Sequence, residues 1–230
     1  MRKNIKKLVG GAITCIALTF LGLNISSEIE ENQKMKKEQY ENAAQIETSE
    51  EFTQAIKNNI GYAFIYGELA AVDPVVYPEL EGEYLEIKKE KERYVEHVIN
   101  KDVDDNITGC HTETTHRWEI ENVERKKCEN VILLDVTLQA NKIKLPQKSY
   151  ITAIKESRDL RYCYYGTESR LKGTLYAKLA NNSLEEAQFF ESKDIGQTVE
   201  YLENGAGVVI FWILWMFLIM ACVYVVASLL

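Results

Sequence analysis

The last 25 residues of the chain, 206–230, contain no Asp, Glu, Lys, Arg or His. At about 1.5 Å per residue, a helix of this length reaches roughly 37 Å, which is enough to cross a hydrocarbon core of about 30 Å with some tilt. Phe211, Trp212 and Trp215 crowd its first half, as in the aromatic belt at a membrane interface, and Tyr224 lies toward the other end. The segment predicts a transmembrane helix, because a buried core helix of this kind would need a large protein around it.

A second apolar segment lies near the other end of the chain. Residues 8–24 carry no charge and follow MRKNIKK, which holds four basic residues. This order fits a retained membrane anchor, but a basic region before a short apolar stretch is also typical of a signal peptide. NISSEIEEN, which follows, offers no small-x-small cleavage site. We therefore predict a retained anchor over residues 1–27, with an N-terminal signal as the alternative.

Basic residues indicate the orientation in the membrane. Arg2, Lys3, Lys6 and Lys7 precede the first span, and no basic residue follows the second. The excess of Lys and Arg on cytoplasmic flanks then places both termini in the cytoplasm and residues 28–204 outside it. We expect an integral protein of a bacterial cell membrane, with the lipid bilayer as one partner.

The segment between the spans is acidic. It holds all 35 acidic residues and 23 of the 27 basic ones, so its net charge is 23 minus 35, or −12. This balance argues against a nucleic-acid partner, because modules that bind phosphate backbones are usually basic. The segment between the spans also contains Cys110, Cys128 and Cys163. An oxidising compartment would allow one disulfide, and the spacing does not choose the pair.

Composition divides the middle of the chain. Residues 28–60 are rich in helix formers and predict a helical stalk, broken near ETSEE, with Ser49 as the N-cap of a short second helix. Residues 61–182 are rich in β-branched and aromatic residues and predict one β-rich domain. Residues 183–205 predict a helix and linker that lead into the span at 206–230. The expected fold is an α+β membrane protein, in which two transmembrane helices flank one β-rich extracytoplasmic domain.

The stretch EIKKEKERYVEHV, residues 86–98, is the most charged part of that domain. If it alternates as a strand, Leu85, Ile87 and Val95 share one face, whose centre is basic, while the other face is mostly acidic. We predict a long solvated strand that touches the core through these three apolar residues. Its central charges would pair with neighbouring strands, each pair contributing a few tenths of a kcal/mol. A helix is the alternative, because Lys and Glu favour it.

Short motifs run in a fixed order through about residues 61–180. GYAFIYGELAAVDPVVYPELEGEYLEIKKEKERYVEHV joins a strand to a D-P step and a charged strand, and THRWEIENV, ANKIKLPQKSYI and DLRYCYYG follow. This series resembles the transmembrane protein 43 (LUMA) family, which usually has several spans after the domain where this sequence has one. The resemblance assigns structural roles to the motif residues Asp73, Pro74, Leu85, Ile87, Arg93, Tyr94, Glu96, Trp118 and Arg161. TTHRW is similar to a strand in the membrane domain of GIDE-type E3 ligases, whose RING finger has no counterpart in this sequence.

Few patterns in the sequence point to chemistry. CHTETTHRWE brings together Cys110, His111, Glu113, His116 and Glu119, but its spacing matches neither C-x2-C pairs nor H-E-x-x-H. Solvated strand residues are the favoured interpretation over a metal site. No G-x-S-x-G, Walker A or G-x-G-x-x-G motif occurs. We therefore predict no catalytic, cofactor-binding or metal-binding residue and no cofactor.

These observations favour a non-enzymatic, membrane-anchored scaffold or sensor. Its acidic domain would organise membrane protein complexes, with other membrane proteins or a second copy of the chain as partners. The alternative is an envelope enzyme that uses carboxylates of the same domain as acid and base. A deep cleft with carboxylates of perturbed pKa would favour the enzyme, and a filled core with a flat or grooved surface would favour the scaffold.

Overall fold

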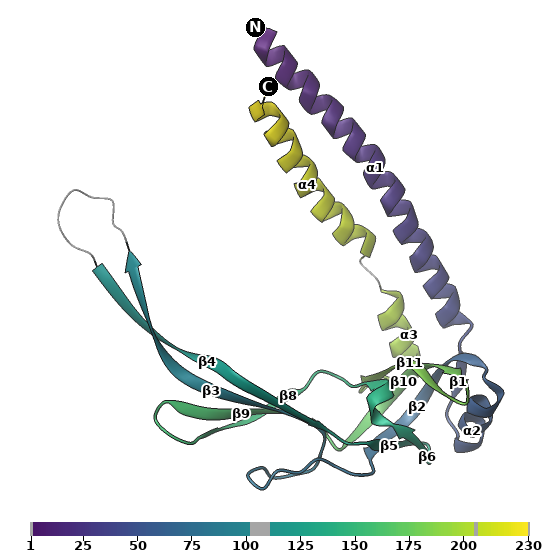
Figure 1. Cartoon of the computed structure of the whole chain (residues 1–230). Coiled ribbons are helices and arrows are strands. Elements are labelled where there is room, and N and C mark those ends of the chain that lie inside the picture. The colour runs from purple at the N-terminus through teal and green to yellow at the C-terminus, as the bar shows by residue number, and fades with distance from the viewer. Residues whose placement is uncertain (1, 102–110, 205–206, 230) are drawn as a thin grey trace. The chain divides into compact units, whose positions relative to one another are not determined.

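The computed structural model describes residues 2–101, 111–204 and 207–229 (Figure 1). The chain divides into two compact units, one made of Met1–Ala43 with Gly196–Leu230 and the other of Ala44–Ile195. The first unit is helical and the second is mostly β. The expected α+β class is confirmed, with long apolar helices on either side of a β-rich domain in the sequence.

The helical unit contains two long helices, α1 (Arg2–Glu41) and α4 (Gly207–Leu229), and α3 (Ile195–Glu203) precedes α4. Segments within Val9–Glu41 and Ile195–Val226 are long and apolar enough to cross a membrane. The segment from Ile25 to Glu41 has no Gly or Pro and many helix formers, which explains why α1 continues into the expected stalk.

Two tryptophans of α4 hold it against α1. The indole N–H of Trp215 donates to the carbonyl of Leu18 at 3.0 Å, and that of Trp212 donates to the hydroxyl of Ser26 at 3.1 Å. Gly22 lies directly against the ring of Trp215, where a Cβ would clash with the indole. The two helices run side by side in Figure 1, and small residues of α1 make room for the large rings of α4.

The β-rich unit begins before the expected boundary at residue 61. Residues 44–58, assigned above to the stalk, form a short strand and a helix that belong to this unit. In helix α2 (Ser49–Asn58), Phe52 is fully buried because the apolar face of the helix packs on the domain core. Its N-cap is Thr48, not Ser49 as predicted, since the Thr48 side chain accepts the backbone N–H of Glu51.

The larger sheet has seven strands and carries most of the core. Its order is β6-β5-β2-β10-β11-β7, with β1 parallel to β2. The strands are β1 (Ala44–Ile46), β2 (Gly61–Ala71), β5 (Asn130–Leu133), β6 (Val136–Gln139), β7 (Ile143–Lys144), β10 (Arg170–Ala180) and β11 (Ser183–Glu191), and the 3-10 turn η1 (Ala140–Lys142) precedes β7. The largest fully buried side chains of the main core cluster are Phe52, Phe189, Ile65, Leu69, Leu85, Leu133, Ile143, Leu175 and Leu179.

Residues 183–191 form strand β11, so the predicted helix and linker over 183–205 is wrong for its first half. Asn181 and Asn182 both adopt positive φ, at 53° each, which fits the tight turn of a β-hairpin and joins β10 to β11. Leu184 and Phe189 are buried in the core. Pairing with β10 thus overrides the helix propensity of SLEEAQ.

The smaller sheet has the order β4-β3-β9-β8, with all neighbours antiparallel. Its strands are β3 (Tyr84–Lys101), β4 (His111–Lys127), β8 (Ser149–Lys155) and β9 (Leu160–Glu168). The predicted strand over the charged stretch is confirmed as β3. Figure 1 shows β3 and β4 continuing beyond the ends of β8 and β9. In register, β3 pairs with β9 only as far as Arg93, whereas its pairing with β4 runs to Lys101.

Candidate functional site

Strand β3 passes from the core to the surface along its length. Leu85 lies in the main core, and Ile87 lies in a second cluster with Val75, Tyr77 and Tyr164. Both side chains are fully buried, as predicted. The prediction that Val95 also contacts the core is wrong, because Val95 is half-buried and belongs to neither cluster. Strand β3 and its neighbours therefore have a buried base at Leu85 and Ile87 and a polar middle over residues 88–93. Beyond Arg93, β3 pairs with β4 alone among the described residues and forms a two-stranded end.

A lysine surrounded by tyrosines occupies one face of the polar middle. The ammonium of Lys89 lies 4.7 Å from the ring centre of Tyr162, 5.3 Å from that of Tyr164 and 5.4 Å from that of Tyr77. Its Nζ also lies 2.9 Å from the carboxylate of Glu79. Alternation places Lys89 on the same face as Tyr162 and Tyr164, while the loop before β3 supplies Tyr77 and Glu79.

Hydrogen bonds in this cluster hold its charges in fixed states. Glu79 accepts the hydroxyl of Tyr164 at 2.7 Å and the ammonium of Lys89, and these bonds lower the pKa of Glu79 to about 2. Partial burial alone would lower the pKa of Lys89, but its contacts with Tyr164 and Glu79 raise it overall. Burial and a hydrogen bond to Glu124 raise the pKa of Tyr77 to about 12. The carboxylate and the ammonium are therefore both charged at neutral pH.

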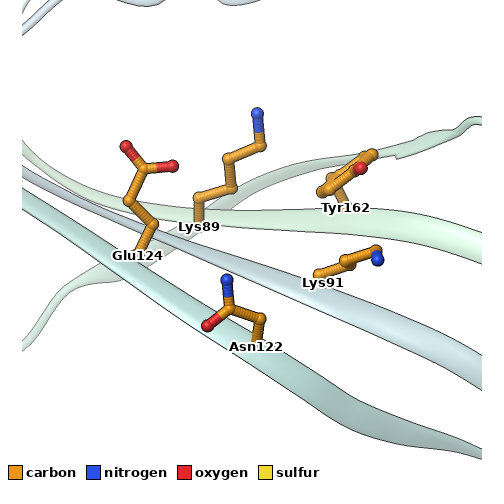
Figure 2. Close-up of a pocket in the computed structure, with 5 residues that line it drawn as sticks. All are labelled: Lys89, Lys91, Asn122, Glu124 and Tyr162. Atoms are coloured by element: carbon orange, nitrogen blue, oxygen red, sulfur yellow. The ribbon is translucent and has the colours of Figure 1, made fainter.

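A shallow pocket of about 270 Å³ lies beside this cluster. Its lining residues are Lys89, Lys91, Asn122, Glu124 and Tyr162. Figure 2 shows them rising from three neighbouring strands of the small sheet. Lys91 pairs with Glu121 at 2.7 Å, as Lys89 pairs with Glu79, so each lysine of the pocket already has a carboxylate partner. The arrangement suits a rigid, charge-balanced surface better than an anion site.

The opposite face of the small sheet holds two buried carboxylates. Glu90 pairs with Lys88 at 2.6 Å, and Glu92 pairs with Arg161 at 2.6 Å. Glu92 also accepts the thiol of Cys163 at 3.4 Å. Glu90 and Glu92 are 5% and 9% exposed, so the predicted solvation of the central charges is wrong for these two residues. Long side chains of β9 and β3 cover them, which strand alternation alone does not reveal.

Aromatic rings extend this face toward the two-stranded end. The guanidinium of Arg161 lies 4.3 Å from the ring centre of Trp118, and Trp118 lies 5.1 Å from Tyr94. Tyr94 in turn stacks on His116 at 5.4 Å. The structure thus brings together Tyr94, Trp118 and Arg161 among the predicted motif residues, with Glu92 as a fourth member that the motifs did not include.

The other motif residues lie elsewhere. Arg93 faces the opposite side and forms an exposed pair with Glu121, with its Nη2 3.1 Å from the carboxylate. Glu96 is exposed on the two-stranded end, and Pro74 is half-buried in the loop after β2. Asp73 fastens that loop, since its carboxylate accepts the backbone N–H groups of Glu129 and Asn130 at 2.7 and 2.9 Å. These two bonds lower the pKa of Asp73.

The residues of CHTETTHRWE, considered above for metal binding, do not meet at one point in the part of the chain that the structure describes. His116 stacks on Tyr94, whereas Glu119 lies on the other face and pairs with His97 at 2.8 Å. Across residues 2–101, 111–204 and 207–229, no three side chains of the types that bind metals gather at one point. Cys110 lies outside the described residues. Cys128 and Cys163 are both buried free thiols and are not joined to each other.

Signals for the lysine and tyrosine cluster exist in the sequence, but they are weak. The stretch RYCYYG places Tyr162 and Tyr164 two residues apart, hence on one face of a strand. The contributions of Tyr77 and Glu79 come from a loop whose path has no periodic signature. The pairing register of β3 with β9 brings Tyr162 and Tyr164 to Lys89, and the path of that loop brings Tyr77 and Glu79.

Replacing Arg161 with alanine should destabilise the domain by about 1–3 kcal/mol, because the buried carboxylate of Glu92 would lose its charged partner. Arg170→Ala is the matched control, since the Arg170–Glu68 pair is largely exposed at both ends and should contribute about 0–1 kcal/mol. Denaturant titration of both variants measures the difference. Equal losses would mean that Glu92 is solvated.

The low pKa of Glu79 predicts a specific dependence of stability on pH. The carboxylate has an ordinary pKa of 4.5 and a folded value of about 2, so its stabilising effect is complete above pH 4.5. That effect should fade as the pH falls toward 2. The difference in melting temperature between the native chain and Glu79→Gln should therefore disappear over this range. Glu81→Gln, in the same loop, controls for loss of charge alone; a difference that persists at pH 2 would contradict the assignment.

In comparisons with family models, curated proteins and solved structures, nothing matches this chain. The resemblance to the transmembrane protein 43 family therefore remains a prediction that rests on the order of short motifs. The interpretation of the site rests on its own geometry: a filled small core, a charge-balanced shallow pocket and an exposed aromatic face.

Proposed function

We propose that this chain is a membrane-anchored, non-enzymatic scaffold, with α1 and α4 as its two spans and the β-rich domain as a binding module. The observation that carries the proposal is the pairing of α1 with α4 through Trp212 and Trp215. In hydrocarbon or at its boundary, an indole N–H that is shielded from water needs a partner, and residues of α1 supply both. Cleavage of α1 as a signal peptide would remove these partners.

The middle of the small sheet supports a binding role over catalysis. Its carboxylates with shifted pKa values, Glu79, Glu121 and Glu124, are all shifted downward by hydrogen bonds and ion pairs. A general acid needs a carboxyl group whose pKa is raised toward neutrality. Charges held in one state suit a recognition surface, and the partners proposed are other membrane proteins or a second copy. An envelope enzyme is the second candidate. The observation that favours it is the pocket beside Lys89, whose walls carry charged and polar side chains.

The intact mass of the protein purified from membranes tests the anchor. We expect the mass of the full chain, 26.4 kDa, with the amino terminus at or next to Met1. Cleavage near Ser27 would instead remove roughly 3 kDa, the size of a signal peptide. Gly22→Leu is a companion variant, because a leucine side chain there has no space beside Trp215. It should weaken co-purification of separately expressed α1 and α4 segments, whereas Leu23→Ala, at an exposed position, should not.

The proposed setting of these helices has both termini in the cytoplasm, residues 28–204 outside it, and a bacterial cell membrane as the bilayer. The four basic residues before the first span support this orientation. The free, buried state of Cys128 and Cys163 is compatible with either side of the membrane. Orientation is therefore tested separately from retention of the anchor.

A further inference from the structure

Strand β4 forms an outer edge of the small sheet. Among the described residues, β3 is its only neighbour in the sheet, so one side of its backbone has no strand partner. Such an edge offers N–H and C=O groups to another strand. No proline interrupts β4, and the bulge opposite Lys91 and Glu92 lies toward its base, leaving the outer half regular.

The backbone hydrogen bonds of β3 show which N–H and C=O groups of β4 point away from β3, toward the free edge of the sheet. The N–H of Tyr94 donates to the carbonyl of Asp159 at 2.9 Å, on the side away from β4. Tyr94 and Trp118 are therefore a pair without direct backbone hydrogen bonds. Because these groups alternate along an antiparallel strand, the N–H and C=O of Trp118, and of His116 and Ile120 on either side, point to the free edge.

The same positions carry exposed apolar and aromatic side chains. Ile120 is 56% exposed and Tyr94 is 39% exposed, next to the stack of Trp118 and His116. We propose that the outer half of β4 is a self-association surface, where two copies of this chain pair β4 with β4 antiparallel about a two-fold axis at Trp118. The proposal deepens the scaffold function above, because copies anchored in one membrane meet at a raised local concentration.

Charge selects this register. In a two-fold antiparallel pair, residues equally spaced from the axis lie opposite each other. An axis at Trp118 sets Arg117 opposite the partner's Glu119, and the reverse, giving two pairs of unlike charge. An axis at Arg117 or Glu119 sets that residue against its own copy, so like charges meet. An axis at His116 or Ile120 sets Glu119 against an acidic residue of the second copy, Glu113 or Glu121 respectively.

Both charged side chains are accessible to a partner. Within one chain Arg117 and Glu119 pair at 2.9 Å, yet their side chains are 66% and 41% exposed. Glu119 also contacts His97 at 2.8 Å on the same face. In the dimer, Arg117 of each copy would pair with Glu119 of the other copy in place of its own Glu119, so every charge would stay paired. The aromatic stacks of the two copies would then lie next to each other on the opposite face.

Cysteine cross-linking tests the register on the full chain purified in detergent, with Cys15, Cys110 and Cys222 replaced by alanine. Opposed residues without direct hydrogen bonds have Cα atoms about 4.5 Å apart, which permits a disulfide. A mixture of differently tagged Arg117→Cys and Glu119→Cys proteins should therefore form a mixed disulfide on mild oxidation. Each protein alone should form at least tenfold less, because its two cysteines would be diagonal neighbours, two residues apart along the paired strands and about 7–8 Å apart, which is at or beyond the reach of a disulfide.

Charge reversal gives a second readout that keeps the strand intact. Arg117→Glu or Glu119→Arg alone should shift the chain toward monomer in sedimentation, and the double variant should restore the dimer. Unchanged far-UV melting of the single variants shows that the domain still folds. A monomer at all concentrations, cross-linking of either single cysteine variant with itself, or dimers unaffected by charge reversal would overturn the proposal. These outcomes do not depend on the orientation of the chain in the membrane, so failure here is distinct from failure of the anchor.

Discussion

Truncation of Ile87 to alanine should lower the free energy of unfolding of the β-rich domain by about 2–4 kcal/mol. Ile87 is fully buried and packs with Val75, Tyr77 and Tyr164, where the loop before β3 covers the small sheet. Removing its outer methyl groups would leave a cavity that the rigid tyrosine rings cannot close. The expected effect is therefore larger than that of any exposed charge on the same strand.

Val98→Ala is the matched control for this prediction. Val98 lies on the same strand and is also β-branched, but it is 58% exposed, so its truncation should change the stability by only a few tenths of a kcal/mol. Denaturant titration of the full chain in detergent, followed by the far-UV signal of the strands, measures both variants. Losses of equal size would show that the second core cluster does not hold the small sheet in place.

Replacement of Gly173 by alanine should cost about 3 kcal/mol, the upper part of the usual range for overpacking. Gly173 lies in β10 between two paired strands, and a Cβ at this position would collide with the backbone carbonyl of Phe190 in β11. A backbone in the middle of a sheet cannot move aside without breaking ladder hydrogen bonds. The clash is therefore not relieved by a change of rotamer.

Gly67 provides a matched comparison, because it pairs directly with Gly173 across the β2–β10 ladder. A Cβ on Gly67 would lie 3.0 Å from the end of the Leu133 side chain, which can shift by a few tenths of an ångström. Gly67→Ala should therefore cost less than about 1.5 kcal/mol. A larger loss for Gly67→Ala than for Gly173→Ala, in the same melts, would mean that β11 is not held against β10 as described.

The sequence was sufficient for the strand β3 and for its buried base. Alternation from Tyr84 onward places Leu85 and Ile87 on one face, and both are core residues in the structure. The same alternation did not predict burial of Glu90 and Glu92. The partner of Glu92, Arg161, lies 69 residues away, and only the register of β3 with β9 brings the two together. Periodicity assigns a face but not what covers it.

Local propensity also misled at one end of the domain. SLEEAQ favours a helix, yet the turn at Asn181 and Asn182 directs this segment back along β10. Two consecutive asparagines between strand-forming residues were the available signal for a hairpin. The membrane segments were easier to identify, because a long run without charge has few alternatives. Their mutual contact through Trp212 and Trp215 depends on helix rotation, which composition does not determine.

Labelling in intact cells tests the central claim, a chain anchored by two spans with its β-rich domain across the membrane. Ser157, exposed between β8 and β9, is replaced by cysteine in a chain that carries Cys110→Ser, while the native Cys128 and Cys163 are buried. A membrane-impermeant maleimide should label this cysteine in intact cells. Asn4→Cys, ahead of the first span, should react only after the membrane is opened. Labelling of Asn4→Cys in intact cells together with protection of Ser157→Cys would contradict the proposed architecture.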